Sequence, residues 1–575
     1  MNTRRTTTQR IGLLIAVSLM LSACLPSTTT VITPTATAKP SATPTVAPTL
    51  TPEPTITPTP AAIEPSWWRE CVFYEIFVRS FYDSDGDGIG DLAGISQKLD
   101  YLNDGDPSSG DDLGVTCIWL MPVMESNSYH GYDVIDYLSI ESDYGGREAF
   151  DAFIDAAHAR GMRIIVDFPI NHTSDQHPWF VEASTNADSP YYAWYLWSDE
   201  DPGYAGPWGQ RVWHPLGDRY YYGLFWGGMP DLNFTIDETT NQIYEVTRYW
   251  LEELRVDGFR LDAIQHLIED GKQQAGTPQT HAWLSDYRKF YRGINPDAMT
   301  VGEVMADSVE VIPYVAQDEI DLAFEFDLAD ALLSSLESGD PGWFGYILKL
   351  AEAGFPSSRY ATFLTNHDQN RVMTQLNGDQ GKARVAATAL LTLPGVPFIY
   401  YGEEIGMTGQ KPDELIRTPL QWSAADGAGF TTGQPWQAVN ADYATVNIAA
   451  QSVDPDSLLS HYRTLIALRN QHKALQLGRL IPLSSTCQPV FAYLRSYEEE
   501  HSLTVLNFKG EPQEGCSLSM EPGPLTPGLY TALDGQSGAE VFSLTVEADG
   551  SISEAALPET LPPFTSLVLM LVPAK

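Results

Sequence analysis

The sequence predicts an α/β protein built around a (β/α)₈ barrel, and three observations carry this prediction. Short apolar runs alternate with amphipathic segments between residues 71 and 474. Several of these runs end in charged or polar residues, as at 164–172, 258–266, 299–304 and 363–371. Polar residues at the carboxyl ends of barrel strands converge on one site. The chain has 575 residues, which is too long for one core, so we also expect further domains.

Barrel strands are expected where the apolar runs fall. The ranges are 71–80, 114–122, 162–168, 258–262, 300–304, 322–326, 360–364 and 397–401. Helices are expected at 146–160, 238–254 and 457–469. In the first of these, Phe150, Phe153 and Ile154 recur at helical spacing, and Gly161 ends the pattern. The barrel would therefore occupy 66–172 and 234–474.

The alternation stops after the third strand, beyond His172, for roughly 60 residues that are rich in Trp, Tyr, Gly and Asp. A loop of this length usually carries function, so we expect an inserted domain at 173–233. Beyond 475 the chain shows short alternating runs between turn residues, such as 502–508 and 565–571. This pattern predicts an antiparallel β-sandwich over 475–575.

The N-terminus has the features of a targeting segment. Basic residues precede the apolar run 11–21, which is too short to span a bilayer as a mature helix. The run ends in Leu-Ser-Ala-Cys, which resembles a bacterial lipobox. This resemblance implies a signal peptide at 1–24 and a lipid on Cys24. We therefore expect an extracellular lipoprotein whose lipid is its sole attachment to the cell envelope.

Residues 25–65 are almost wholly Thr, Pro, Ala and Ser. Such a segment buries too little apolar surface to offset its ordering entropy, so we expect a disordered linker. In a polyproline-like state, at about 3.1 Å per residue, it could hold the folded part roughly 120 Å from a membrane.

Charge restricts the classes of partner. The chain has 33 basic and 75 acidic residues and a formal net charge of −42, which disfavours nucleic acids and anionic surfaces. A neutral glycan is compatible with this charge. The 14 Trp and 28 Tyr residues also suit stacking on sugars, although large proteins bury many aromatic residues in any case.

A carboxylate and an arginine lie two residues apart at the end of the run 258–262. Residues two apart on a strand share a face, so Arg260 can lie beside Asp262. A permanent cation at this distance lowers the pKa of a carboxyl group. Asp262 would then be ionised at neutral pH, as a carboxylate nucleophile must be. A purely structural ion pair is the alternative interpretation of this segment.

Two further acids, Glu303 and Asp368, also follow short apolar runs. Together the four polar-ended segments resemble, in order and spacing, the conserved regions of the α-amylase family, glycoside hydrolase family 13. Three more segments resemble that family, at 114–122, 229–233 and 395–404. The resemblance extends from about residue 67 to about 475. It implies a catalytic barrel, a domain B after the third strand and a C-terminal β domain.

The resemblance also implies roles for individual residues. Asp262 would be the nucleophile and Glu303 the acid/base, while Asp368 would bind sugar hydroxyls most tightly when the ring is distorted. We expect burial and nearby carboxylates to raise the pKa of Glu303, which must be protonated at rest. Tyr132 would stack under the sugar. Other substrate contacts would come from Arg260, His172, His367, His130, Gln265, His266 and Arg417.

Acidic residues also recur just after the first strand. Their loop spacing is that of oxygen ligands in an EF-hand, but Gly94 stands where an EF-hand carries its last Glu, and a strand precedes the loop. The segment resembles the calcium loop of oligo-1,6-glucosidase-like family members. An acidic turn without a metal is the alternative. The Ca²⁺ ligands implied are Asp83, Asp85, Asp87 and Asp91 through their side chains, and Ile89 through its carbonyl.

A second family calcium site would lie near Asn171, Asn233 and the carbonyl of His266. Metal-binding relatives carry Asp at the position of Asn233, which leaves this second site open.

The remaining cysteines divide into two pairs. Cys71 and Cys117 fall in neighbouring predicted strands, and we expect buried thiols there. Cys487 and Cys516 both fall in the β domain and are candidates for a disulfide in an oxidising compartment, although the sequence does not fix connectivity.

Two departures from the oligo-1,6-glucosidase pattern bear on specificity. Ala263 follows the nucleophile, where relatives that cleave α-1,6 bonds tend to carry Val. Tyr129 stands where exo-acting relatives carry an Asp that pairs with the arginine matching Arg417 and closes the pocket. We therefore expect an open cleft and endo-type, retaining cleavage of α-1,4-glucan.

Other activities stay open. The segment 229–233 is intermediate between the oligo-1,6-glucosidase and neopullulanase patterns, so an α-glucosidase, a cyclomaltodextrin-degrading enzyme and a glucanotransferase are alternatives. A non-catalytic glycan-binding lipoprotein would require the loss of a catalytic carboxylate, and none is lost. We expect a monomer.

Overall fold

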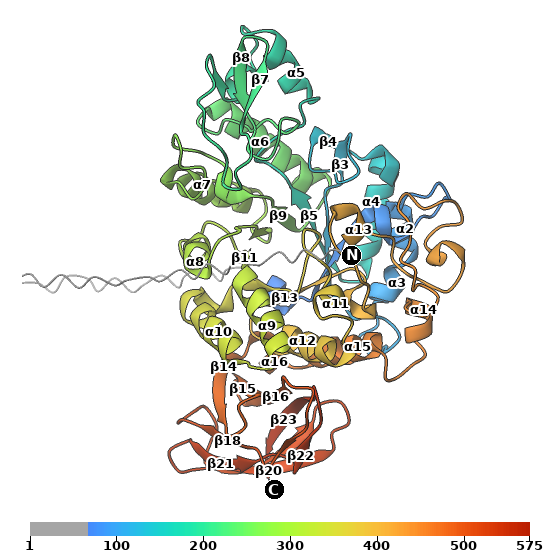
Figure 1. Ribbon diagram of the computed structural model, residues 1–575, viewed down its shortest axis with the longest axis vertical. Coiled ribbons are helices and arrows are strands. Elements are labelled where there is room, and N and C mark those ends of the chain that lie inside the picture. Colours follow the sequence, from blue (N-terminus) through green and yellow to red (C-terminus); the bar gives the residue numbers. More distant parts are fainter. Residues whose placement is uncertain (1–66, 575) are drawn as a thin grey trace, which may run out of the picture. The chain divides into compact units, whose positions relative to one another are not determined.

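The computed structural model describes residues 67–574 and contains a closed barrel of eight parallel strands (Figure 1). The last strand pairs with the first, through Phe398 and Phe73, and this pairing closes the barrel. The predicted fold class is therefore confirmed. In chain order the strands are β1 (Phe73–Ile76), β2 (Cys117–Leu120), β5 (Arg163–Phe168), β9 (Gly258–Leu261), β10 (Met299–Gly302), β11 (Leu322–Phe324), β12 (Tyr360–Thr362) and β13 (Val396–Tyr400).

The first strand is shorter than predicted. It ends at Ile76, and a helical turn, α1 (Val78–Phe81), follows where the sequence predicted strand to residue 80. The sixth strand likewise ends at Phe324, and α9 (Phe326–Ser338) begins two residues later. After β1 the apolar run continues from a buried strand into a buried helical turn, so hydrophobicity alone does not mark this boundary.

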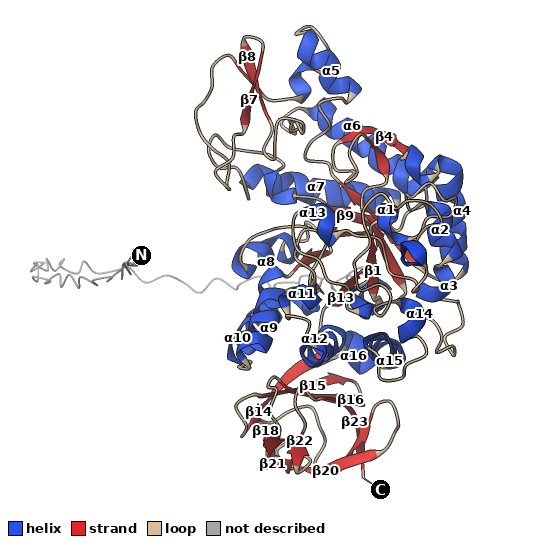
Figure 2. Ribbon diagram, turned by 45° about the vertical axis from the view of Figure 1, so that its right-hand side comes forward, coloured by secondary structure: helices blue, strands red, loops and turns tan. Residues whose placement is uncertain are grey.

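Helices surround the barrel (Figure 2). The helix predicted at 146–160 is α4 (Gly146–Ala159), which buries Phe150, Phe153 and Ile154. The range predicted at 238–254 is α6 (Asp237–Arg248) followed by a π-helical turn, Tyr249–Glu253. The remaining long helices are α7 (Pro278–Ile294), α8 (Ser308–Ala316), α10 (Gly342–Gly354), α12 (Gln380–Thr392) and α15 (Leu458–Gln471).

The barrel interior is filled by apolar side chains. Phe73 stacks on Phe398 with ring centroids 4.3 Å apart, and Trp119 and Phe324 pack beside them. All four side chains are buried. The interior is thus a core, as is usual for this fold, and polar chemistry is left to the strand ends.

The segment 173–233 forms a small unit with its own sheet. It contains α5 (Pro178–Thr185) and three strands in the order β6-β8-β7, namely β6 (Trp197–Ser198), β7 (Trp213–Leu216) and β8 (Arg219–Tyr222). Phe180 packs against Tyr195 and Tyr221, so many of the aromatic residues here form a core. Trp208 is different, because its side chain is 58% exposed.

The C-terminal part contains an antiparallel sheet of eight strands and a two-stranded sheet formed by β17 (Gln513–Glu514) and β22 (Thr560–Leu561). The sheet curls until its edge strands, β20 (Glu540–Val546) and β21 (Ile552–Ala556), lie next to each other. The predicted antiparallel β domain is thus confirmed, and its eight-stranded sheet folds around an apolar core. The other strands are β14 (Arg479–Ser485), β15 (Val490–Tyr497), β16 (Glu500–Asn507), β18 (Ser517–Met520), β19 (Gly528–Asp534) and β23 (Ser566–Pro573).

Both cysteine pairs are disulfides. The bond between Cys487 and Cys516 confirms the candidate pair in the β domain, with Cα atoms 5.5 Å apart. Cys71 and Cys117 are buried, as expected, but the prediction of free thiols is wrong, because they are bonded with Cα atoms 5.8 Å apart. Parallel pairing aligns Phe73 of β1 with Cys117 of β2, which brings Cys71 within the usual Cα range for a disulfide.

Within the described range 67–574, no helix is both long and apolar enough to cross a bilayer. The predicted signal peptide, the lipidation site Cys24 and the linker at 25–65 lie outside the described residues.

Candidate active site

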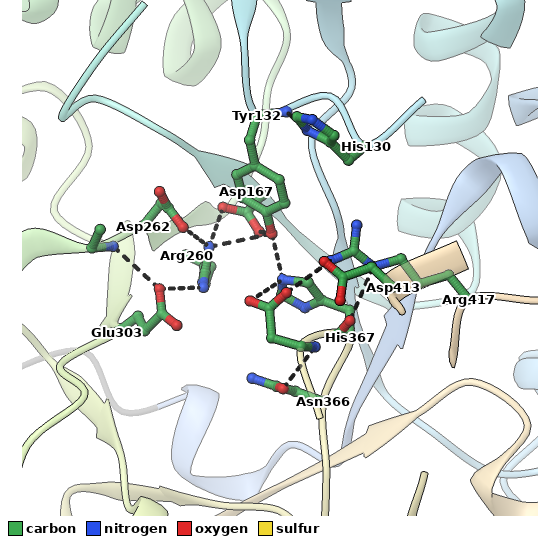
Figure 3. A network of polar contacts seen from close by, with 12 residues as sticks. His130, Tyr132, Asp167, Arg260, Asp262, Glu303, Asn366, His367, Asp413 and Arg417 are labelled. Carbon is green, nitrogen blue, oxygen red and sulfur yellow. Dashed lines mark hydrogen bonds and ion pairs between the residues drawn. The ribbon is translucent and has the colours of Figure 1, made fainter. Parts of the chain in front are cut away.

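A buried polar network lies at the carboxyl ends of the barrel strands (Figure 3). Asp167 of β5 and Arg260 of β9 are partners in the parallel register, so their side chains lie side by side. Asp262 and Glu303 each directly follow the last residue of a strand, β9 and β10. Asp368 lies in the loop after β12. The strand ends thus gather acids that lie far apart in the sequence.

One guanidinium group links three of these acids. Nη1 of Arg260 lies 2.7 Å from Oδ1 of Asp262 and 2.8 Å from Oδ1 of Asp167. Its Nη2 atom lies 2.7 Å from Oε2 of Glu303. Arg260 is 1% exposed, so solvent screens these three ion pairs only weakly. The predicted nucleophile and the predicted acid/base are thereby held at the two ends of one cation.

Burial raises the pKa values of both acids. The pKa of Glu303 rises to about 7, as expected, because burial outweighs the attraction of Arg260. The pKa of Asp262 also rises, to about 6, and its cause is again burial. The expectation that Arg260 would lower the pKa of Asp262 below its usual value is therefore wrong. A single cation shared among three carboxylates offsets only part of the desolvation of each.

Asp368 is held ionised by two cations. Burial alone would raise its pKa, but His367 and Arg417 outweigh that effect and lower it. Nε2 of His367 lies 3.2 Å from Asp368, and Nη2 of Arg417 lies 2.7 Å from it. The Asp368 side chain is nevertheless 37% exposed, so it can still contact a ligand.

His367 is a buried cation in this network. Its Nδ1 atom lies 2.5 Å from Oε1 of Glu75. Burial disfavours its charge, but Asp368 and Glu75 outweigh burial and raise its pKa to about 10. Nε2 lies 2.6 Å from the Tyr132 hydroxyl, which in turn donates to Asp167 over 2.9 Å. Both ring nitrogens of His367 therefore act as donors at neutral pH.

Tyr132 lies in the midst of this network and stays partly exposed. Its ring stacks on that of His367, with centroids 5.6 Å apart and planes 16° apart, and His130 stacks beside it at 6.1 Å. His172 lies behind Tyr132, and its Nε2 atom is 3.2 Å from the Tyr132 carbonyl. Burial lowers the pKa of His172 to about 4, so this ring is neutral.

Arg417 pairs with two acids, although Tyr129 stands where the resemblance implies an acid in exo-acting relatives. Its guanidinium binds Asp368 and lies 3.4 Å from Asp413. Tyr129 instead stacks on Trp436, with centroids 5.4 Å apart and planes 26° apart. Arg417 therefore stabilises the negative charge of Asp368, and the Tyr129–Trp436 pair lies at the position of Tyr129 instead of an acid.

Gln265 and His266 do not join the network. The Gln265 amide lies 3.0 Å from Nε2 of His266, and Nδ1 of His266 donates to the Gln274 carbonyl over 2.6 Å. A cavity of about 420 Å³ adjoins Gln265 and Val304, next to Glu303. A larger cavity of about 870 Å³ lies at the opposite ends of the strands and is lined by none of the predicted site residues.

The sequence prediction missed Asp167, Glu75 and Asp413, although each holds a charged site residue. Asp167 and Glu75 are acids inside otherwise apolar strands, and that pattern was the available signal. It counted Trp208 among many aromatic residues that could stack on sugars, without singling it out, and it missed Phe225. The rings of Trp208 and Phe225 stack with centroids 5.7 Å apart. Phe225 also contacts the His172 ring in a T-shaped arrangement, with centroids 5.3 Å apart.

The acidic loop after α1 brings three of its predicted ligands together. Single carboxylate oxygens of Asp83, Asp85 and Asp91 all lie within 4.8 Å of one another. Asp87 lies outside this group and accepts from the Ile89 amide over 2.7 Å. Converging carboxylate oxygens are what Ca²⁺ requires, so these residues fit such an ion.

The sequence left open a second calcium site near Asn171, Asn233 and the His266 carbonyl. Asn171 donates to Asp231 over 3.0 Å, and burial raises the pKa of Asp231 to about 7. The side-chain oxygen of Asn233 accepts instead from Thr235. The Asn233 side-chain oxygen is thus used within its own turn, by the amide and hydroxyl of Thr235.

Comparison with known proteins agrees with this geometry. A family model described as the α-amylase catalytic domain matches residues 75–478. Alpha-amylase 3 of Dictyoglomus thermophilum is 37% identical over 445 residues, covering 77% of this chain and 85% of the relative. An oligo-1,6-glucosidase of Heyndrickxia coagulans is 33% identical over 522 residues, covering 77% and 92%. The crystal structure of an α-amylase from H. orenii shares 40% identity with a TM-score of 0.75, covering 87% and 99%. The chain therefore belongs to the α-amylase family, glycoside hydrolase family 13, and is a glycoside hydrolase.

Proposed function

We propose that this enzyme is a retaining, endo-acting α-amylase that hydrolyses α-1,4 bonds of starch and maltooligosaccharides. One observation carries the proposal: Asp262 and Glu303 contact the two ends of the same buried guanidinium, and the pKa of Glu303 is about 7. At neutral pH a large fraction of Glu303 is a proton donor, while most of Asp262 is a carboxylate. Two acids in these opposite states are what retaining hydrolysis needs.

In the first step, the Glu303 carboxyl group donates its proton to the glycosidic oxygen. The bond from that oxygen to the anomeric carbon breaks, and the Asp262 carboxylate forms an ester to the same carbon. In the second step, Glu303 takes a proton from water, and the water oxygen displaces Asp262. The anomeric configuration inverts twice and is therefore retained.

Asp368 positions the sugar in this scheme. Its carboxylate is ionised, partly exposed and held by Arg417 and His367. Such an acceptor can bind two hydroxyl groups of the reacting sugar. Contacts that become stronger as the sugar ring distorts stabilise the transition state more than the bound substrate. They therefore lower the activation free energy of bond cleavage, and not only the substrate dissociation constant.

Endo-type cleavage is supported by what surrounds the site. Tyr129 and Trp436 form an aromatic pair where exo-acting relatives carry an acid, and Arg417 is already paired inside the site. Trp208 is more than half exposed and stacked on Phe225, so it can serve as an aromatic wall for further sugars. Ala263 directly follows the nucleophile, and its small side chain leaves room for the next sugar in the α-1,4 orientation.

Calcium is part of the proposal. Asp83, Asp85 and Asp91 would hold the ion with their carboxylates. Because the Thr431 hydroxyl donates to Asp83, the ion would also help to fix the loop after α1 against the segment that carries Thr431. The ion would supply structural stability and no catalytic chemistry.

Early products from amylose test the proposal. An endo-acting enzyme releases α-anomeric maltooligosaccharides of mixed length, and iodine staining falls faster than reducing ends rise. If glucose is the sole early product, the enzyme is an α-glucosidase. If chain lengthening or cyclic products dominate, it is a glucanotransferase.

Attachment to the cell envelope is a separate proposal that rests on the lipobox resemblance of Cys24. Cys24→Ala should yield a soluble and active enzyme, because a lipid anchor contributes nothing to the site. A variant that stays with the membrane fraction would contradict lipid anchoring.

A further inference from the structure

Helix α10 presents two aromatic side chains to solvent. Trp343 is 55% exposed and Tyr346 is 57% exposed. Their ring centroids lie 5.5 Å apart and their planes differ by 18°. Residues three apart on a helix share a face, so the two rings stack on each other and form one exposed aromatic patch, which we call the α10 platform.

The platform contributes little to the fold. The opposite face of α10 buries Phe344, Ile347 and Leu348. Phe344 packs against Phe491 and Phe508 of the C-terminal sheet, and these contacts fix the helix. A Trp and a Tyr left more than half exposed are therefore not explained by packing. Rings with an apolar face and a polar tip are typical of binding surfaces.

We propose that the α10 platform, Trp343 and Tyr346, is a second α-glucan-binding site outside the catalytic centre. This inference rests on the proposed function, which supplies a polymer as the ligand. The C–H face of a sugar ring stacks on an aromatic plane, and both Trp343 and Tyr346 keep more than half of their surface open for such a contact. Asp340 and Lys349 flank the platform on the same segment, where they can accept from and donate to sugar hydroxyls.

Charge favours a glucan over other occupants. The net charge of −42 opposes binding of anionic lipid or nucleic acid, whereas α-glucan is neutral. A zwitterionic lipid surface is the competing occupant, because Trp and Tyr also suit membrane interfaces.

The location of α10 suits a polymer. Figures 1 and 2 show α10 beside α9 in the outer layer of helices, whereas the catalytic network lies at the barrel strand ends. A chain held at α10 stays near the enzyme while another of its segments enters the site. This raises the effective substrate concentration for long glucans and not for short ones.

Retention by amylose tests the inference. The assay is affinity electrophoresis in gels with and without amylose, in the catalytically inactive Asp262→Asn background. The test variant adds Trp343→Ala and Tyr346→Ala. The matched control adds Leu529→Ala, which truncates a side chain that is 51% exposed on the C-terminal sheet. In parallel, the two platform substitutions are made in the active enzyme and assayed on maltotriose.

We expect the platform variant to bind amylose about tenfold more weakly, while the Leu529→Ala control is unchanged. In the active enzyme, kcat/KM for maltotriose should stay within about twofold of wild type. Equal retention of platform variant and control would overturn the inference. The inference would also be overturned if the platform variant lost binding to phosphatidylcholine vesicles but kept its retention by amylose. The proposed function fails separately, if the wild-type enzyme releases no maltooligosaccharides from starch.

Discussion

The Nη2 atom of Arg260 lies 2.7 Å from Oε2 of Glu303. The same guanidinium binds Asp262 and Asp167, so its charge is divided among three carboxylates in a buried site. Each acid is desolvated more than it is compensated, and the pKa values of Asp262 and Glu303 both move toward neutrality. The two acids then differ in protonation over a narrow range of pH.

The first prediction follows from that range. Because Asp262 must be ionised and Glu303 protonated, kcat/KM should rise as pH increases through about 6 and fall as pH increases through about 7. These are the apparent values of an interacting pair. A pH profile from about pH 4 to about pH 9 checks the prediction. The residual activity of Glu303→Gln should lack the alkaline limb, and a wild-type profile that is flat from about pH 5 to about pH 8 would contradict it.

The second prediction concerns calcium. Asp85→Ala should abolish most of the decrease in melting temperature that EDTA causes, because it removes a carboxylate from the converging group. At a Ca²⁺ concentration of about 100 times the dissociation constant, the ion would contribute about 2.7 kcal/mol to the free energy of unfolding. Differential scanning calorimetry with and without EDTA measures the effect.

Asp188→Ala is the matched control for calcium, because Asp188 is an exposed acid outside the loop. It should keep the EDTA-sensitive shift of the wild type. A shift that persists in Asp85→Ala would place the metal elsewhere.

The third prediction concerns the buried pair of His367 and Glu75. The folded-state pKa of His367, about 10, lies above its unfolded value of about 6.5. The stability from this charge is therefore fully present below about pH 6.5 and is lost as pH rises toward about 10. Glu75→Gln removes one partner of the His367 cation and with it part of this stability. It should lower the melting temperature by about 2–5 °C near pH 6.

The difference between wild type and Glu75→Gln should shrink as the pH rises. Thermal unfolding followed by circular dichroism near pH 6 and near pH 9.5 measures it, and the exposed Glu559→Gln serves as the control. A difference that grows toward alkaline pH would show that His367 is neutral in the folded enzyme.

The sequence predicted the barrel because apolar runs alternate with amphipathic segments and several of the runs end in polar residues. It located Asp262, Glu303 and Asp368 for the same reason. Strand ends such as that at Ile76 were less predictable, because the apolar pattern passes directly into a buried helix.

What the sequence could not show were relations between strands. Asp167 contacts Arg260 through the register of β5 and β9, and this contact divides the charge that was expected to serve Asp262 alone. The disulfide of Cys71 and Cys117 likewise follows from the alignment of β1 and β2. Composition and spacing carry no information on such alignments.

The central claim is that Asp262 is the nucleophile and Glu303 the acid/base. The most direct test is kcat on soluble starch for Asp262→Asn, with circular dichroism to verify the fold. We predict a decrease of about 10³-fold or more, because the substitution removes the group that forms the covalent bond, and Glu303→Gln should lose activity to a similar degree. A folded Asp262→Asn enzyme with kcat within about tenfold of wild type would contradict the assignment.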